Sequence, residues 1–153
     1  MAALNHLPVA KAEMLIRKPV EEVFEAFIDP AITSKFWFTK SSGRLEAGTR
    51  VRWDWKMYGA SAEVDVLEIE ANKRILIDFG TKVEWMFTPR AENETFVAIT
   101  NSGFTGDGDD IVKQAIDSTE GFTIVLCGLK ALLEHGILLN LVPDKAPDAH
   151  VKR

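Results

Sequence analysis

The stretch that decides the fold is DIVKQAIDSTEGFTIVLCGLKALLEHGILL, residues 110–139. Its apolar residues recur at the three- and four-residue spacing that is typical of one face of a helix. They are Ile111, Ala115, Phe122, Val125, Leu126, Leu129, Leu132, Leu133 and Ile137. We therefore expect one long amphipathic helix over residues 110–139, which must cover its apolar face with another part of the chain.

Gly121 interrupts this pattern near its middle. A glycine inside a helix costs about 1 kcal/mol relative to alanine, so a compensating reason is expected. Two interpretations stay open. The glycine lets one continuous helix approach the sheet or bend over a ligand, or it marks where a short helix ends and a longer one begins near Thr119.

The residues before this helix alternate between apolar and polar types, which is the pattern of half-buried strands. The clearest run, residues 50–57, places Val51, Trp53 and Trp55 on one face. Four further runs, separated by short turns, cover residues 62–69, 75–79, 83–87 and 95–104. The alternation slips at Leu67, as it would at a bulge. Because the connections are short, we expect five strands that pair as antiparallel neighbours.

The N-terminal part predicts a strand and two short helices. Residues 12–16 form the strand candidate, and Pro19 suits the first position of a helix because its missing N–H costs nothing there. Apolar residues then follow at helical spacing. Asp29 is a good N-cap and precedes a proline, which predicts a second helix that ends at Phe36 or Trp37.

Length and composition indicate one globular domain. The chain has 153 residues, of which 46% are hydrophobic and 27% charged, and this length buries a sizeable core. The net charge is −5, so nucleic acid is an unsuitable partner. The most apolar stretch, residues 122–133, is interrupted by Lys130 and is shorter than the roughly 20 residues that a membrane span needs. We expect no membrane span.

The N-terminus has no basic start followed by a sustained apolar segment, so no signal peptide is read and a cytoplasmic location is expected. Cys127 is the one cysteine, which excludes an internal disulfide and suits a reducing compartment. Because free cysteine is among the most buried residue types, we expect Cys127 to act as a small core residue.

The order strand, helix, helix, five-stranded meander and long helix resembles the START-like (SRPBCC, birch-pollen-allergen-like) helix-grip superfamily. The chain looks most like its bacterial group akin to the activator of the ninety-kilodalton heat-shock protein's ATPase. The residues that carry the resemblance, within about residues 12–138, are Pro19, Val23, Phe24, Asp29-Pro30, Phe36-Trp37, Gly48, Gly103-Phe104, Gly121-Phe122, Leu129-Lys130 and Leu133-Glu134. It implies an α+β fold in which a curved six-stranded sheet grips the C-terminal helix. We expect a single START-like domain over residues 1–153, ordered from about 10 to 140, with loose termini.

No catalytic or metal-binding set is recognised. The three histidines, His6, His135 and His150, lie far apart in the sequence, whereas a metal site needs ligands that converge on one point. The sequence has no Gly-x-Ser-x-Gly motif around a nucleophile. We expect no catalytic residue, no metal and no cofactor.

The tryptophans are the most informative candidates for a binding site. The chain has four, and several are expected on the concave side of the sheet. One interpretation is that they fill the core; the other is that they line an apolar pocket. The candidate pocket residues are Trp37, Trp53, Trp55, Trp85, Phe87, Asn101, Phe122 and Leu126. Asn101 would orient a guest by hydrogen bonding if its side chain points inward.

We therefore expect the protein to bind a small hydrophobic or amphipathic molecule between the sheet and the last helix, without catalysis. The resemblance implies an alternative, a chaperone-associated interaction module. Another alternative is an enzyme of the polyketide-cyclase type, because related folds host such chemistry, although fold alone does not grant a function. A homodimer is kept as one expected assembly.

Overall fold

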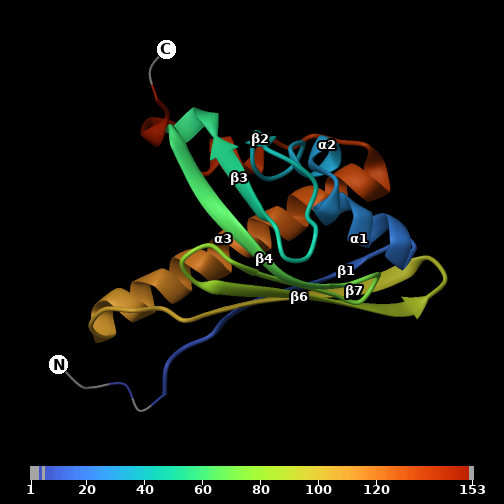
Figure 1. Cartoon of the computed structure of the whole chain (residues 1–153). Helices are drawn as coiled ribbons and strands as arrows, with labels where there is room; N and C mark the ends of the chain where they lie inside the picture. Colours follow the sequence, from blue (N-terminus) through green and yellow to red (C-terminus); the bar gives the residue numbers. More distant parts are fainter. Residues whose placement is uncertain (1–3, 5, 152–153) are drawn as a thin grey trace.

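A seven-stranded antiparallel sheet curves around one long helix in the computed structural model, which describes residue 4 and residues 6–151 (Figure 1). The strands lie in the order β1-β7-β6-β5-β4-β3-β2. Their bounds are β1 Ala10–Ile16, β2 Lys40–Ser41, β3 Arg50–Trp55, β4 Ala60–Glu70, β5 Arg74–Asp78, β6 Lys82–Ala91 and β7 Glu94–Ser102. The first strand therefore pairs with the last, and β6, β5, β4, β3 and β2 follow β7 in that order across the sheet.

The helices lie on the concave side of this sheet. Their bounds are α1 Val20–Ile28, α2 Pro30–Thr33, η1 Lys56–Tyr58, α3 Gly108–His135, α4 Leu141–Asp144 and η2 Pro147–Ala149. In Figure 1, α3 passes behind β4 and lies above β6 and β7, with α1 and α2 beside its C-terminal half. This is the α+β helix-grip arrangement that the sequence predicts.

The sheet confirms the expected meander and adds one short strand. β3 to β7 pair with their sequence neighbours in antiparallel register. The predicted bulge is present, because the register of β4 against β5 shifts between Val66 and Glu68. The seventh strand, β2, lies in what was expected to be loop and pairs Lys40 with Asp54 and Ser41 with Trp53.

α3 begins with a capping box and ends at a glycine. The Asp107 carboxylate accepts the Asp110 N–H at 2.9 Å, and the Asp110 carboxylate accepts the Asp107 N–H at 3.3 Å. Gly136 has a φ of 66°, the left-handed conformation in which helices commonly end. The predicted end at Leu139 is wrong, because this turn redirects the chain after His135.

The helix is continuous through Gly121, so the two-helix interpretation is wrong. A Cβ atom at Gly121 would meet no atom within 4 Å. The close approach that was considered for Gly121 occurs instead at Gly128, where a Cβ atom would lie 3.3 Å from Phe36 Cβ. Cys127, next to it, is half-buried rather than fully buried.

The core lies between the concave sheet face and the helices. Its largest fully buried side chains include Trp53 and Trp85 on the sheet and Leu126 and Leu129 on α3. α2 is shorter than predicted and ends at Thr33. The segment after α2 contains Trp37 and Phe38, and both rings pack against Trp53 of β3.

Candidate functional site

An apolar hollow of about 320 Å³ lies between the middle of α3 and the end of the sheet where β3 connects to β4. Aromatic side chains form much of its wall, with Trp37, Trp55 and Phe79 facing Phe122 of α3. Gly121 contributes bare backbone on the helix side. Ligand sites in proteins typically have volumes of 300–1,000 Å³ and apolar walls with a few polar groups, so this hollow has the size and lining of a small-molecule site.

Trp37 is the centre of the aromatic wall. Its ring centre lies 4.8 Å from that of Trp53, 5.7 Å from Phe122, 5.9 Å from Trp85 and 6.3 Å from Trp55. Most of these pairs meet edge to face, an arrangement that aromatic rings prefer over a face-to-face sandwich. The rings therefore hold one another in place and give the hollow a preformed wall.

The structure brings the predicted site residues together in two layers. Trp37, Trp55 and Phe122 line the hollow. Four of the other five are buried behind this layer in the core: Trp53, Trp85, Phe87 and Leu126. Both interpretations of the tryptophans thus describe part of the set, since Trp53 and Trp85 fill the core and Trp37 and Trp55 face the open space.

Asn101 points inward and is 3% exposed, but its side chain is already engaged. Its amide nitrogen donates to Thr81 Oγ1 and to the Lys82 carbonyl, each at 2.8 Å. Its amide oxygen accepts the Ser118 hydroxyl at 2.7 Å. Asn101 therefore ties α3 to the sheet through Ser118, a residue that also lines the hollow.

Two buried indole groups have unused donors. The Nε1 atoms of Trp53 and Trp85 have no hydrogen-bond partner among the residues that the structure describes. A buried donor without a partner costs about 1–3 kcal/mol. Both indole rings lie against Trp37, which lines the hollow.

The segment after α3 closes one side of the hollow. We call residues 137–151 the C-terminal strap; it contains α4 and η2. The Tyr58 hydroxyl donates to the carbonyl oxygens of Val142 and Pro143, and the Val151 N–H donates to the Met57 carbonyl at 2.7 Å. These bonds hold the strap against η1 and place Val142 and Lys145 at the rim.

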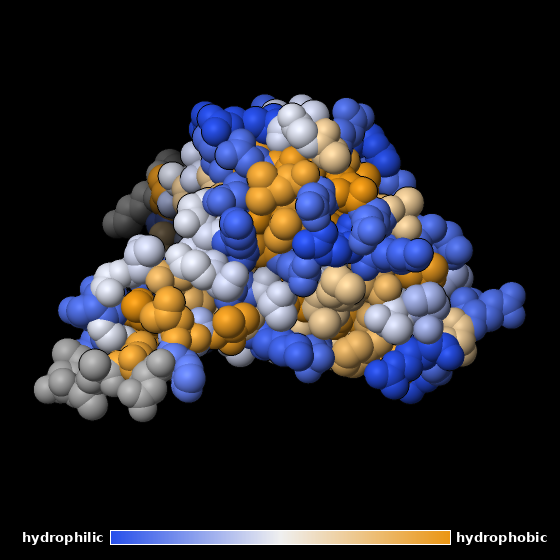
Figure 2. All heavy atoms as spheres, turned by 60° about the horizontal axis from the view of Figure 1, so that its bottom comes forward, coloured by the Kyte–Doolittle hydropathy of each residue, from blue (hydrophilic) through white to orange (hydrophobic). Residues whose placement is uncertain are grey.

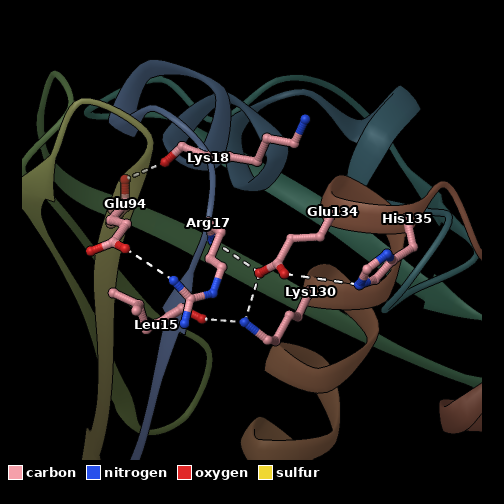
Figure 3. A network of polar contacts seen from close by, with 8 residues as sticks. Leu15, Arg17, Lys18, Glu94, Lys130, Glu134 and His135 are labelled. Carbon is pink, nitrogen blue, oxygen red and sulfur yellow. Dashed lines mark hydrogen bonds and ion pairs between the residues drawn. The ribbon is translucent and has the colours of Figure 1, made fainter.

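A separate polar network fastens the other end of α3 to β1 (Figure 3). Lys130 Nζ donates to the Leu15 carbonyl at 2.8 Å and to Glu134 Oε2 at 2.7 Å, and the Arg17 N–H donates to the same carboxylate oxygen at 2.9 Å. Burial alone would raise the pKa of Glu134, which is 10% exposed, but these hydrogen bonds outweigh it and hold the pKa below its usual range. The network lies outside the hollow and positions the helix that forms its wall.

Over residue 4 and residues 6–151, no three His, Cys, Asp or Glu side chains gather in a way that could hold a metal ion. No helix in the same residues is long and apolar enough to cross a bilayer. The candidate site therefore consists of aromatic rings, backbone and a few polar groups.

Several residues of the hollow are absent from the predicted set. They are Tyr58, Ala60, Phe79, Ser118, Gly121, Ile124, Val125, Val142 and Lys145. Helical spacing from Phe122 could have indicated Ser118 and Val125, at four and three residues from it. Tyr58 lies in a turn, and its partner Val142 is 84 residues away, so no local pattern reveals their contact.

The family model described as Activator of Hsp90 ATPase homolog 1-like protein matches residues 17–134. This span runs from the end of β1 to the last turn of α3. The C-terminal strap lies beyond it, although the strap supplies one wall of the hollow. No curated protein matches the sequence.

Solved structures share the fold. A protein from Staphylococcus saprophyticus is 32% identical with a TM-score of 0.77, and the match covers 86% of this chain and 96% of that one. The Aha1 dimer from Colwellia psychrerythraea is 20% identical with a TM-score of 0.72, covering 84% and 98%. A putative protein of the dynemicin biosynthetic locus is 22% identical with a TM-score of 0.73, covering 85% and 48%. The last two similarities concern fold alone.

Proposed function

This chain belongs to the family of Activator of Hsp90 ATPase homolog 1-like proteins, and from that premise we propose that it binds a small hydrophobic or amphipathic molecule without transforming it. The observation that carries the proposal is the hollow of about 320 Å³ beside α3, with its aromatic wall. A preformed apolar hollow favours binding because the walls need not be reorganised when a guest enters.

The proposal is tested by filling the hollow from the helix side. In Gly121→Leu, a leucine side chain would extend into the open space, because no atom lies within 4 Å of a Cβ atom there. Purified protein is incubated with 1-decanol, and binding is measured by titration calorimetry and native mass spectrometry. We expect the wild type to bind, and Gly121→Leu to lose at least about tenfold in affinity, since leucine occupies space the guest needs.

Thr123→Leu is the matched control. Thr123 lies on the same helix, is exposed and does not line the hollow, so the same side chain is introduced without filling the space. It should bind like the wild type. Absence of binding by the wild type, both to decanol and to a broader set of small apolar compounds, would contradict the proposal.

Chaperone association is the second proposal, and exposed apolar surface supports it. Ile116 on α3 is 62% exposed, and Val112 one turn earlier is 40% exposed. Figure 2, turned so that the bottom of Figure 1 comes forward, shows several clusters of apolar atoms among hydrophilic ones. Exposed apolar patches commonly mark interaction sites. Titration with a bacterial Hsp90 should show binding that Ile116→Asp weakens; no binding by the wild type would dismiss this proposal.

A homodimer is proposed on the same surface. The exposed apolar residues of α3 would be covered if a second copy packed there, and a dimer of similar fold is known from Colwellia psychrerythraea. Sedimentation equilibrium should give a mass near twice 17.1 kDa, and Ile116→Asp should lower it. A single species of one-chain mass across the concentration range would contradict it.

Catalysis of the cyclase type is the remaining alternative. The titratable side chains that line the hollow are Tyr58 and Lys145, and the Tyr58 hydroxyl is engaged with the strap. Mass spectrometry of a bound compound before and after prolonged incubation distinguishes the two functions. We expect an unchanged mass, and a product that forms only with protein present would favour the enzyme.

A further inference from the structure

One charged side chain stands at the rim of the hollow. Among the described residues that line it, only Lys145 carries a full charge; the rest are apolar, aromatic or hydroxyl-bearing. Lys145 is the C-cap of α4, and its backbone N–H donates to the Leu141 carbonyl at 2.9 Å. The strap therefore places the backbone of a cationic residue at the edge of an apolar space.

The partner of this cation is weakly held. Lys145 Nζ lies 3.1 Å from Glu120 Oε1, and the two side chains are 35% and 59% exposed. Exposed ion pairs of this kind contribute little stability, because water screens the charges and both long side chains lose freedom. A second carboxylate could take the place of Glu120 at small cost, since Glu120 would return to solvent.

The position of Lys145 also favours an exchange of partners. Lys145 lines a hollow whose other walls are mostly apolar, and a charge-assisted hydrogen bond is stronger where the surroundings are less polar. Glu120 is exposed on α3, whereas a guest in the hollow would meet Lys145 from among the apolar lining residues. An anionic group on the guest would thus compete well for Lys145.

Resting on the proposed function, we infer that the preferred guest is a small anionic amphiphile, such as a medium-chain carboxylic acid. Its apolar body lies against Trp37, Trp55 and Phe122, and its carboxylate binds Lys145 in place of Glu120. The volume of the hollow is at the lower end of the range for ligand sites, which favours a compact or short-chain body over a long lipid.

The test compares decanoate with 1-decanol, which have the same chain length and differ in charge. Dissociation constants are measured by titration calorimetry at pH 7.5, where the acid is ionised. We expect the wild type to bind decanoate at least about fivefold more tightly than decanol, a preference of the size that one favourable ion pair provides. Lys145→Gln should remove the preference, and Lys145→Arg should restore it.

Two further variants separate local contact from general charge. Glu120→Gln frees Lys145 from its competitor, so decanoate should bind more tightly while decanol is unchanged. Lys113→Gln removes an equal charge from an exposed position on α3 that does not line the hollow, and it should leave the preference intact.

The outcomes distinguish this inference from the proposed function. Equal binding of decanoate and decanol by the wild type overturns the inference and leaves the proposed function standing. A preference for decanoate that persists in Lys145→Gln also overturns it. If the wild type binds neither compound, the inference is overturned and the proposed function loses its support as well.

Discussion

Two glycines of α3 differ in the space around them, and this difference gives opposite expectations for alanine. Gly121→Ala should raise the free energy of unfolding by about 1 kcal/mol, because alanine favours the helix and its methyl group meets no atom within 4 Å. Gly128→Ala should give no gain or a loss, because its methyl group would lie 3.3 Å from Phe36 Cβ and 3.4 Å from Phe36 O. Urea unfolding of both variants checks the pair; a stabilising Gly128→Ala would contradict it.

Glu134 makes the stability of the protein depend on pH. Its pKa is lower in the folded protein than in the unfolded chain, so its charged form contributes stability that is complete above the usual glutamate pKa and is lost as the pH falls through the folded-state value. Glu134→Gln should lower the free energy of unfolding by about 1–2 kcal/mol at pH 7. The gap should close on acidification, as the wild-type carboxylate takes up a proton.

Asp65→Asn is the control for this prediction. Asp65 also has a lowered pKa, owing to its hydrogen bond from Arg50, but this pair lies on the exposed surface. It should cost less at pH 7, because solvent screens exposed pairs. Urea titrations at pH 7 and pH 4 provide the comparison, and a Glu134→Gln penalty that is the same at both values would refute the assignment.

The sequence pattern predicts which way the β3 side chains at the site point, but not the direction of Asn101. The alternation of β3 correctly places Val51 and Trp53 inward, because a strand exposes its faces with a period of two. The direction of Asn101 could not be predicted, since β7 carries apolar residues on both alternations. Asn101 points toward α3, where its side chain accepts a hydrogen bond from Ser118, 17 residues later in the chain.

At the level of elements, the strap is held against η1 by hydrogen bonds that single substitutions can remove. Tyr58→Phe removes the hydroxyl that donates to the Val142 and Pro143 carbonyls. We expect faster hydrogen exchange in residues 137–151, while the free energy of unfolding falls by no more than about 1.5 kcal/mol, the usual contribution of one hydrogen bond. Hydrogen exchange with mass spectrometry measures both the strap and the core strands.

Thr49→Val is a suitable comparison for the tyrosine variant. The Thr49 hydroxyl also donates to a backbone carbonyl, that of Glu46 at 2.6 Å, but Thr49 belongs neither to the strap nor to the hollow. It should leave exchange in residues 137–151 unchanged. Equal exchange in the strap of wild type and Tyr58→Phe would mean that other contacts hold this segment.

The predicted bounds of the elements are wrong where the local sequence signals conflict or are too short to show a pattern. Ile137 continues the helical spacing, but Gly136 ends the helix with a positive φ, as glycine commonly does. β2 could not be read from the sequence, because two residues are too few for a period and it forms only by pairing with β3. The bulge in β4, by contrast, is visible in the sequence as a slip of the alternation.

For the whole molecule, the pairing of the strands could be predicted from the sequence, whereas the position of the C-terminal strap beside the hollow could not. Short turns favour pairing of neighbouring strands, and a long amphipathic helix has to cover a sheet, so a helix on an antiparallel meander follows from pattern; the resemblance supplies the helix-grip arrangement. The strap has no such pattern. Its place depends on hydrogen bonds from Tyr58 to Val142 and from Val151 to Met57, pairs that lie 84 and 94 positions apart in the chain.

The aromatic wall also has an optical consequence. All four tryptophans belong to one group, with the ring centres of Trp53, Trp85 and Trp55 within 4.8–6.3 Å of that of Trp37. At such separations, excitation energy passes between indoles before it is emitted, so the fluorescence of the protein comes from a coupled set. Because Trp37 and Trp55 face the hollow, a quenching guest would dim the whole set, and the protein carries its own reporter of occupancy.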